Sequence, residues 1–516
     1  MKLKTCKILF FLFIVEIGVA QNTFFGCVLG SNYNKSLADV EIHDFYDGFI
    51  TKTDKDGNFK FANKKPKLKL VFYKQNYHYK VINIDANDYQ KIYLNPYSFD
   101  LNEVVVIGSQ SVFSNTKLND VVENSIFAGK KSNKIIMQNF SGDKSSNNAR
   151  QIYNKIGGLN IFQNDDAGLQ LNIGGRGLNP GRSANFNIRQ NNYDISADVL
   201  GYPESYYTPP AEALREIQII RGAASLQYGT QFGGLVNFVF NQPKRNKKIN
   251  IQTRNNFGSN SLYTNFTSLS GQIKKLGYYS FVNYKIGNGF RPNSNFESLN
   301  IFAYFDYQIS QKIKTSFEVT YLTYLAKQAG GLTDKMFYNN MLQSNRERNW
   351  FKIDWILYNS KLNFKINTKD NISINLFTLD ANRFSLGYRS ARVDQADPLN
   401  ERDLIKGFFN NYGVESRYLN YYKFLNKKSV LLSGFKYYVA NNISEQGPGS
   451  ADDDANFNFA LNDYQYYPNQ SSYNYPNFNR AFFIENILYL DSNLSITPGC
   501  RYEYIDTKSD GYYRAV

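Results

Sequence analysis

The sequence has little of the residue types that build disulfide scaffolds, metal sites and catalytic centres. Among 516 residues there are 2 His, 2 Trp and 3 Cys. Cys6 lies in the N-terminal leader, and the remaining two, Cys27 and Cys500, are too few and too distant for a disulfide framework. No H-x-x-E zinc pair and no G-x-S-x-G elbow occurs. We therefore expect no enzyme, no metal site and no bound cofactor.

The sequence also lacks a hydrophobic run of the roughly 20 residues that a membrane-spanning helix needs. Its one marked apolar run, Ile8–Val15, is shorter, follows three lysines and precedes the small residues Gly18 and Ala20. This pattern predicts a secretory signal peptide, residues 1–20, cut after Ala20. The predicted protein is exported and is not an α-helical membrane protein.

Aromatic residues and positive charge are plentiful. Tyr and Phe number 41 each, and the formal net charge is +15. The basic residues are scattered rather than gathered in a block, and the chain is expected to be exported, so we do not expect a nucleic-acid partner. We attribute the excess of positive charge partly to compositional bias and partly to an interior suited to anionic ligands.

Residues 22–97 consist of short β-like runs separated by turn residues, which predicts an all-β sandwich. Asp54–Gly57 has the composition of a hairpin turn. A calcium loop is the alternative, but a third acidic ligand and the distant bidentate Glu are missing. The expected strands are Phe24–Leu29, Val40–His43, Phe49–Thr53, Asn58–Ala62, Lys69–Tyr73, Tyr79–Ile84 and Lys91–Leu94.

Three short motifs of this region, Gly26–Val28, Leu37–Val40 and Thr53–Phe59, resemble the carboxypeptidase-regulatory-like domain. That domain precedes the plug in many Bacteroidetes-type outer-membrane receptors. The resemblance implies a small domain ahead of a plug, and it covers about 70 residues.

Residues 101–108 form a stretch rich in β-branched residues, whose role has two possible interpretations. Its key residues are Leu101, Glu103, Val104, Val105 and Val106. Such a strand could add to the sheet edge of a partner protein, or it could be the first strand of the next domain. The stretch resembles the L-x-E-V-V-V-x-G sequence at or beside the TonB box of TonB-dependent receptors.

Residues 109–243 contain amphipathic segments and a glycine-rich core. Ile217–Ile220 and Leu235–Phe240 are expected strands, and the glycines between them permit tight turns. Neither G-K-[ST] nor a helix-opening G-x-G-x-x-G is present, so no nucleotide site is expected.

This core resembles the plug of TonB-dependent outer-membrane receptors, which implies a plug at residues 101–243. Arg215-Glu216 reverses the usual acidic-basic order, and Gln218 stands where an acid is common. Arg176–Pro180 and Tyr324–Asp334 also resemble the ferric dicitrate receptor branch. The residues that carry the plug resemblance are Arg176, Gly177, Arg221, Gly222, Tyr228, Gly229, Gly233, Gly234 and Asn237.

From residue 248 to residue 516 the sequence alternates in the manner of a transmembrane β-barrel. In Leu299–Ile309 the odd-numbered residues are apolar, and the other face carries polar residues and two aromatics. Short turns on one side alternate with long polar, aromatic loops at Lys327–Arg348, Ser390–Leu404 and Asn441–Asn477.

We count roughly ten or eleven candidate strands here, whereas plugged transporters of this type close with about 22. The expected barrel is therefore incomplete, an open, curved sheet around residues 101–243. The whole chain is predicted to be mainly β: an N-terminal β-sandwich, an α+β plug and a partial transmembrane antiparallel β-barrel.

The resemblance implies energy-coupled uptake of a ferric chelate, such as iron(III) dicitrate or another siderophore, across the outer membrane. The expected partners are a periplasmic TonB-type coupling protein, the ligand and outer-membrane lipid, with the N-terminal domain in the periplasm. His43 and His78 precede the plug, so an axial haem ligand has no candidate.

Four arginines are candidates for binding an anionic chelate: Arg176, Arg182, Arg189 and Arg389. Each has a structural alternative, hydrogen bonding between plug and barrel or within loops. The alternative function is a polysaccharide or other nutrient importer of the same fold paired with a surface lipoprotein, and an added signalling role is a further possibility.

Overall fold

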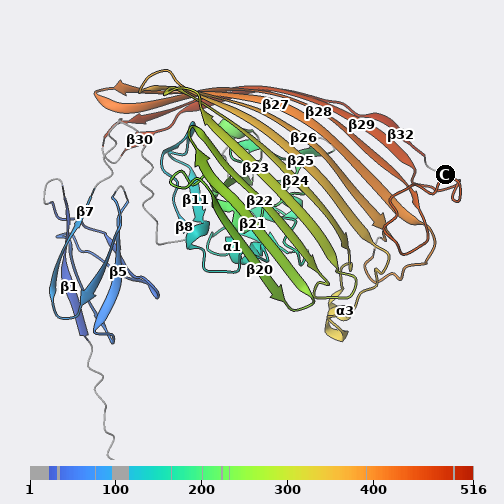
Figure 1. The fold of residues 1–516 in the computed structure, drawn as a ribbon, viewed down its shortest axis with the longest axis horizontal. Helices are drawn as coiled ribbons and strands as arrows, with labels where there is room; N and C mark the ends of the chain where they lie inside the picture. The colour runs from blue at the N-terminus through green and yellow to red at the C-terminus, as the bar shows by residue number, and fades with distance from the viewer. Residues whose placement is uncertain are drawn as a thin grey trace, which may run out of the picture. The chain divides into compact units, whose positions relative to one another are not determined.

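The chain forms two compact units, residues 1–112 and 113–516, in the computed structural model (Figure 1). The described residues are 22–514 apart from 32–34, 76, 96–114, 164, 200–201, 222–224, 230, 232, 391 and 492–493. The predicted signal peptide, the candidate coupling strand 101–108 and Gly222 lie outside the described residues.

The first unit contains a β-sandwich of two sheets, as its sequence pattern predicted. One sheet has the order β4-β1-β7 and the other β3-β2-β5-β6. Phe24 and Val28 of the first sheet and Leu70 and Phe72 of the second are fully buried in one shared core. The strands are β1 (Asn22–Gly30), β2 (Glu41–Asp44), β3 (Gly48–Lys52), β4 (Asn58–Asn63), β5 (Lys67–Tyr73), β6 (Lys80–Asp85) and β7 (Tyr89–Leu94).

The turn Asp54–Gly57 is present, but the hairpin predicted there is wrong. The Asp54 carboxylate accepts the N–H groups of Asp56 at 3.0 Å and Asn58 at 2.8 Å. This turn joins β3 to β4, which belong to different sheets, because β4 pairs with β1 instead. Turn chemistry fixes the local bend and not which strands pair.

The plug occupies residues 115–243 of the second unit and is built on a six-stranded sheet of order β15-β14-β19-β18-β11-β8. β18 and β19 cover the two strands expected from the sequence and pair antiparallel, while β14 runs parallel to β19. The elements are β8 (Asn115–Thr116), β9 (Val121–Val122), β10 (Ser125–Ile126), β11 (Lys131–Ile136), η1 (Met137–Asn139), α1 (Ala149–Tyr153), β12 (Leu159–Phe162), β13 (Asn172–Gly175), η2 (Gly181–Ser183), β14 (Phe186–Gln190), β15 (Tyr193–Asp194), β16 (Ala197–Val199), β17 (Tyr202–Glu204), η3 (Ala211–Ala213), β18 (Leu214–Arg221), α2 (Ser225–Tyr228) and β19 (Gly234–Phe240).

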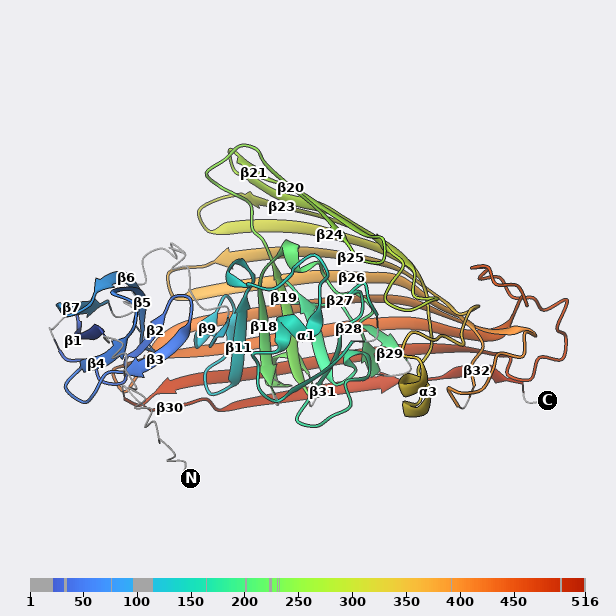
Figure 2. The same ribbon diagram turned by 90° about the horizontal axis from the view of Figure 1, so that it is seen from below.

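Residues 250–513 form one 13-stranded antiparallel sheet, here called the wall sheet, which curves around the plug (Figures 1 and 2). Its elements are β20 (Asn250–Gly258), β21 (Leu262–Ile273), β22 (Leu276–Gly287), β23 (Phe296–Gln308), β24 (Ile313–Lys327), α3 (Asp334–Asn339), β25 (Trp350–Lys365), β26 (Asp370–Gly387), β27 (Arg402–Phe424), β28 (Lys427–Gly449), β29 (Ser471–Tyr489), β30 (Ser495–Ile496), β31 (Gly499–Thr507) and β32 (Asp510–Tyr513).

Among the described residues the wall sheet is open, because β20 pairs only with β21 while β30, β31 and β32 all pair with β29. This confirms the expectation of a curved, unclosed sheet. Because the last three strands share one position beside β29, the sheet has eleven positions, in agreement with the count made from the sequence.

The two faces of the wall sheet differ as the alternation predicted. On β23 the outward Ile301, Phe305 and Tyr307 are about 40% exposed, whereas the inward Phe302 and Asp306 are buried. The inward aromatic residues share one core with the plug. The outer face is therefore a broad apolar surface, as expected of strands that face lipid. None of the helices in the described part of the chain has the length and hydropathy that a bilayer crossing requires.

Of the predicted long loops, one is shifted by two to three residues and another is much shorter than expected. β27 begins at Arg402 and β28 continues to Gly449, so the loops span 388–401 and 450–470 instead of Ser390–Leu404 and Asn441–Asn477. Asn441 and Asn442 pair with Asn410 and Phe409. Strands that extend beyond the apolar band of the sheet keep their backbone hydrogen bonds without apolar side chains. Because these strand ends are polar, the sequence analysis assigned them to loops.

Candidate functional site: the plug joints and the long loops

The plug is joined to the wall sheet by a buried ion pair between Arg189 and Glu415. Arg189 lies on β14 and is completely buried, and Glu415 is an inward residue of β27. The guanidinium donates to both carboxylate oxygens, at 2.9 and 2.5 Å, and its Nε donates to Asn187 at 2.8 Å. Such a bidentate pair fixes both position and orientation.

Further charges surround this pair and alternate in sign. Lys436 of β28 lies 3.1 Å from Asp194 of the plug and 4.0 Å from Glu415. Arg417, two residues after Glu415, lies 3.9 Å from it. The guanidinium carbons of Arg189 and Arg417 lie 4.8 and 4.6 Å, respectively, from the centroid of the Tyr228 ring. The joint is therefore a network in which each buried charge has an opposite charge or an aromatic face beside it.

A second joint uses neutral donors. Glu318, an inward residue of β24, accepts from Gln190 at 3.1 Å and from Asn191 at 2.7 Å. Gln190 also donates to Thr320 at 3.0 Å. The two joints contact adjacent plug residues, 189 and 190–191, with wall strands β27 and β24, so this end of β14 is held from two directions.

The long loops are braced by three arginines that the sequence analysis did not single out. Arg402 is completely buried and donates to the carbonyls of Ser450 at 2.8 Å and Asp454 at 2.7 Å. Arg348 pairs with Asp397 and donates to the Ala451 carbonyl.

Arg346 completes the brace. It donates to the Gln395 carbonyl at 2.9 Å and to Ser390 at 2.8 Å, and its guanidinium lies over the Tyr388 ring. Together the three arginines join loops 328–349, 388–401 and 450–470 into one body.

The Arg348 contact also sets the charge of Asp397. Burial raises the pKa of the Asp397 carboxyl, but hydrogen bonds from Arg348 and from the Leu399 N–H outweigh burial, so its pKa lies below the ordinary value. The carboxylate stays ionised at neutral pH and keeps loops 328–349 and 388–401 together.

The four candidate ligand arginines lie in different surroundings. Arg176 is exposed and has a left-handed backbone, φ 57°, while Arg389 is exposed on loop 388–401. Arg189 is occupied by Glu415, which corresponds to the structural alternative considered for it. The backbone of Arg182 belongs to η2, and its side chain lies outside the described residues. No contact joins Arg176, Arg189 and Arg389 to one another.

The residues of the plug motif have structural contacts. Gly234 has φ 132°, and a Cβ there would lie 1.9 Å from the Ile220 carbonyl oxygen, so only glycine fits between β18 and β19. Asn237 is completely buried and links Gln218 at 2.9 Å to Asn192 at 3.0 Å. Arg221 donates to the Gly157 carbonyl. Gly177 lies in the turn after β13, Gly229 directly follows α2, and Gly233 lies in a bend directly before β19.

Glu415 could have been found from the sequence. Glu415 and Arg417 occupy alternate positions of one long aromatic strand, and charged residues at that spacing mark an inward face. The partner of Glu415 could not be read, because Arg189 lies 226 residues away. Among the described residues, no group of three metal-ligating side chains is present.

The sequence matches no protein-family model and no curated protein. Solved structures do match. The unliganded ferric citrate transporter FecA is 17% identical, with a TM-score of 0.61, over 74% of this chain and 57% of that chain. This is the plug-and-barrel fold of outer-membrane iron receptors.

Two further plug-and-barrel structures resemble the chain. The ferripyoverdine receptor of Pseudomonas aeruginosa is 10% identical, with a TM-score of 0.60, over 75% of this chain and 53% of that one. The ferric yersiniabactin uptake receptor FyuA of Yersinia pestis is 11% identical, with a TM-score of 0.57, over 75% of this chain and 61% of that one. The chain thus spans less than two thirds of the length of these receptors, all of which are transporters or receptors rather than enzymes.

Proposed function

We propose that the chain is a TonB-dependent outer-membrane transporter that takes up a ferric chelate, such as iron(III) dicitrate or another siderophore. The observation that carries this proposal is a plug held by buried polar joints inside a wall sheet whose outer face is apolar. The names of the structural neighbours support an iron chelate as cargo.

The proposed mechanism is binding without covalent chemistry. The braced long loops and the exposed arginines receive an anionic chelate from outside. A periplasmic TonB-type coupling protein then adds to residues 101–108 as a partner strand and pulls, so that the plug is remodelled. In this proposal residues 22–97 form a carboxypeptidase-regulatory-like domain in the periplasm, and residues 1–20 are removed on export.

Growth with ferric citrate as the sole iron source tests the transport proposal. Cells that carry the intact gene should grow, and cells from which it is deleted should not unless the gene is restored. Equal growth of both strains would count against iron(III) dicitrate as the cargo.

Arg389 is the ligand-binding arginine that we expect to matter most, because it is exposed and the structure shows no ion pair for it among the described residues. Arg389→Ala should weaken binding of iron(III) dicitrate about tenfold or more, the effect of one lost charge-assisted bond. Arg392→Ala is the matched control, because that exposed arginine already pairs with Asp394 at 2.6 Å. Equal losses in the two variants would argue for a general charge effect.

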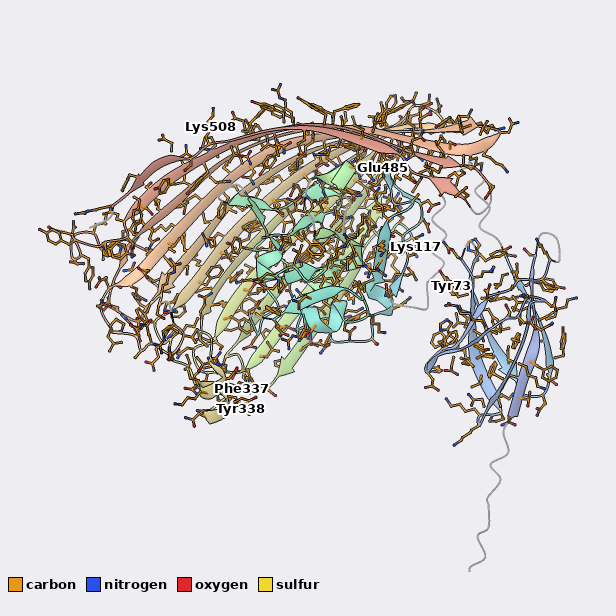
Figure 3. All side chains as sticks on the ribbon, turned by 180° about the vertical axis from the view of Figure 1, so that it is seen from behind. Tyr73, Lys117, Phe337, Tyr338, Glu485 and Lys508 are labelled. Carbon is orange, nitrogen blue, oxygen red and sulfur yellow. The ribbon has the colours of Figure 1, made fainter. Side chains whose placement is uncertain are left out.

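One observation favours the alternative, import of a polysaccharide. α3, on loop 328–349, carries Phe337 and Tyr338, which are 51% and 84% exposed and point away from the wall strands (Figure 3). Exposed aromatic faces suit stacking on sugar rings. Calorimetry with oligosaccharides and with iron(III) dicitrate separates the two proposals, since Tyr338→Ala should weaken only the binding of a sugar.

A further inference from the structure

Residues 118–128, here called the anchor segment, form a wedge between the plug sheet and the wall sheet. The Asp120 carbonyl accepts the Phe127 N–H at 2.7 Å and so closes a small hairpin around β9 and β10. One side of the segment, with Leu118 and Phe127, packs on plug residues of β18 and β19. The other side, with Ile126 and Ala128, is buried against wall strands β27, β28 and β29.

The polar groups of the anchor segment are held mainly by the wall. Lys361 donates to Glu123 at 2.9 Å, and Asn371 donates to Asn124 at 2.6 Å.

Two more residues of the wall sheet make polar contacts with the anchor segment. Arg417 donates to the hydroxyl of Ser125 at 2.9 Å, and the Tyr489 hydroxyl donates to Asp120 at 2.8 Å. Arg417 also donates to the Asn124 carbonyl at 3.3 Å. Four wall strands, β25, β26, β27 and β29, thus make polar contacts with these eleven consecutive residues.

Gln227 of α2 connects these contacts. Its side-chain amide pairs with the backbone of Ile126 in both directions, accepting its N–H at 3.2 Å and donating to its carbonyl at 2.6 Å. The same amide accepts from Arg417 at 3.1 Å and donates to Glu485 of β29 at 2.8 Å. Gln227 is buried, and Figure 3 shows Glu485 on the wall beside the plug. Loss of this one amide removes four hydrogen bonds from the interface between the anchor segment, α2 and the wall sheet.

The anchor segment lies early in the second unit, so a pull on the chain ahead of it acts on these contacts first. It follows the candidate coupling strand 101–108 and precedes the inner strands of the plug sheet. Between them the structure describes residues 115–117, of which Asn115 and Thr116 form β8 and pair with β11. A pull on residues 101–108 therefore meets the anchor segment before it meets β18 or β19.

We infer that the anchor segment is a latch that must leave the wall sheet during transport, and that Gln227 is the positioning residue that holds it closed. The inference rests on the proposed function. It adds that plug release begins at Gln227 and the anchor segment, while the Arg189–Glu415 joint holds the rest of the plug.

Hydrogen exchange of the purified full chain tests the latch without any transport. Gln227→Met keeps the side-chain volume and removes the amide, and it should raise exchange of residues 118–128 about tenfold or more while β18 stays protected. The matched control is Gln218→Met, a buried amide that bonds only within the plug, to Glu216 and Asn237. It should raise exchange in β18 and not in the anchor segment. The same exchange pattern in both variants, or no change with Gln227→Met, would overturn the inference.

A reversible crosslink tests whether the latch must open. Asn124 and Asn371 touch, so Asn124→Cys and Asn371→Cys together, in a Cys500→Ser background, should form a disulfide that ties the anchor segment to β26. Uptake of radiolabelled iron(III) dicitrate should fall at least tenfold in the oxidised protein and return on reduction. Unchanged uptake by fully crosslinked protein would overturn the latch. If wild-type cells take up none, the cargo proposal fails, and hydrogen exchange still decides the latch.

Discussion

Arg189 of the plug and Arg402 of the long loops are both completely buried, but their charges are satisfied in different ways. Arg189 faces a buried carboxylate, Glu415, on another element. Arg402 donates mainly to backbone carbonyls of loop 450–470, and its one acidic partner, Asp454, is 58% exposed.

The difference distinguishes Arg189, which joins the plug to the wall sheet, from Arg402, which braces a loop. A buried carboxylate and a buried guanidinium each depend on the other for their charge to be satisfied. Separating the plug from the wall sheet at Arg189 and Glu415 therefore costs much free energy. Carbonyl oxygens near the surface have water as an alternative partner, so Arg402 shapes a loop at a smaller cost when it is lost. Plug retention and loop shape should therefore respond differently to removal of an arginine.

The largest effect should follow from breaking the buried pair. Glu415→Ala leaves the Arg189 guanidinium buried without its carboxylate and should lower the free energy of unfolding by about 3–5 kcal/mol. Arg189→Met combined with Glu415→Leu removes both charges and should cost less than Glu415→Ala alone. Thermal unfolding of the purified variants measures both. A double variant whose loss of stability equals the sum of the losses in Arg189→Met alone and Glu415→Leu alone would mean that the charges do not depend on each other.

A smaller and local effect should follow from removing the loop brace. Arg402→Met keeps the apolar stem but removes the donors to Ser450, Asp454 and the Arg348 carbonyl, at a cost of about 2–3 kcal/mol. Hydrogen exchange should rise in loop 450–470, and the plug should keep its protection. Loss of protection in the plug as well would remove the distinction between joining and bracing.

Alternation made the fold readable from the sequence. On β23 the period of two assigned the outward and inward faces correctly, because one face meets the plug and the other meets lipid in the proposed setting. The strand ends around Asn441 were missed, because strands that extend past the apolar band keep their backbone pairing and lose the apolar signal.

The candidate site was readable only in part. Charged residues were visible, but their partners lie far along the chain: Arg189 meets Glu415 after 226 residues and Arg348 meets Ala451 after 103. Local sequence carries no record of such contacts. It therefore could not tell that Arg189 is occupied while Arg389 is exposed.

The smallest effect should come from the half-exposed pair of Glu123 and Lys361, the surface counterpart of the buried joint. The Lys361 ammonium holds the pKa of Glu123 at about 2, against the desolvation that would raise it. Because the pKa is lowered by folding, the pair stabilises the anchor segment above the ordinary Glu pKa of about 4.3 and loses this effect as the pH falls toward 2. Glu123 is 53% exposed, so the contribution should be under about 1 kcal/mol. Opening free energies of residues 118–128 from hydrogen exchange, wild type against Glu123→Gln, should differ at pH 6 and converge toward pH 2. A difference that grows in acid, where the carboxyl becomes neutral like the Gln amide, would mean that the ionised carboxylate is not its source, so that ion pairing at this position, unlike that at Glu415, does not hold the plug.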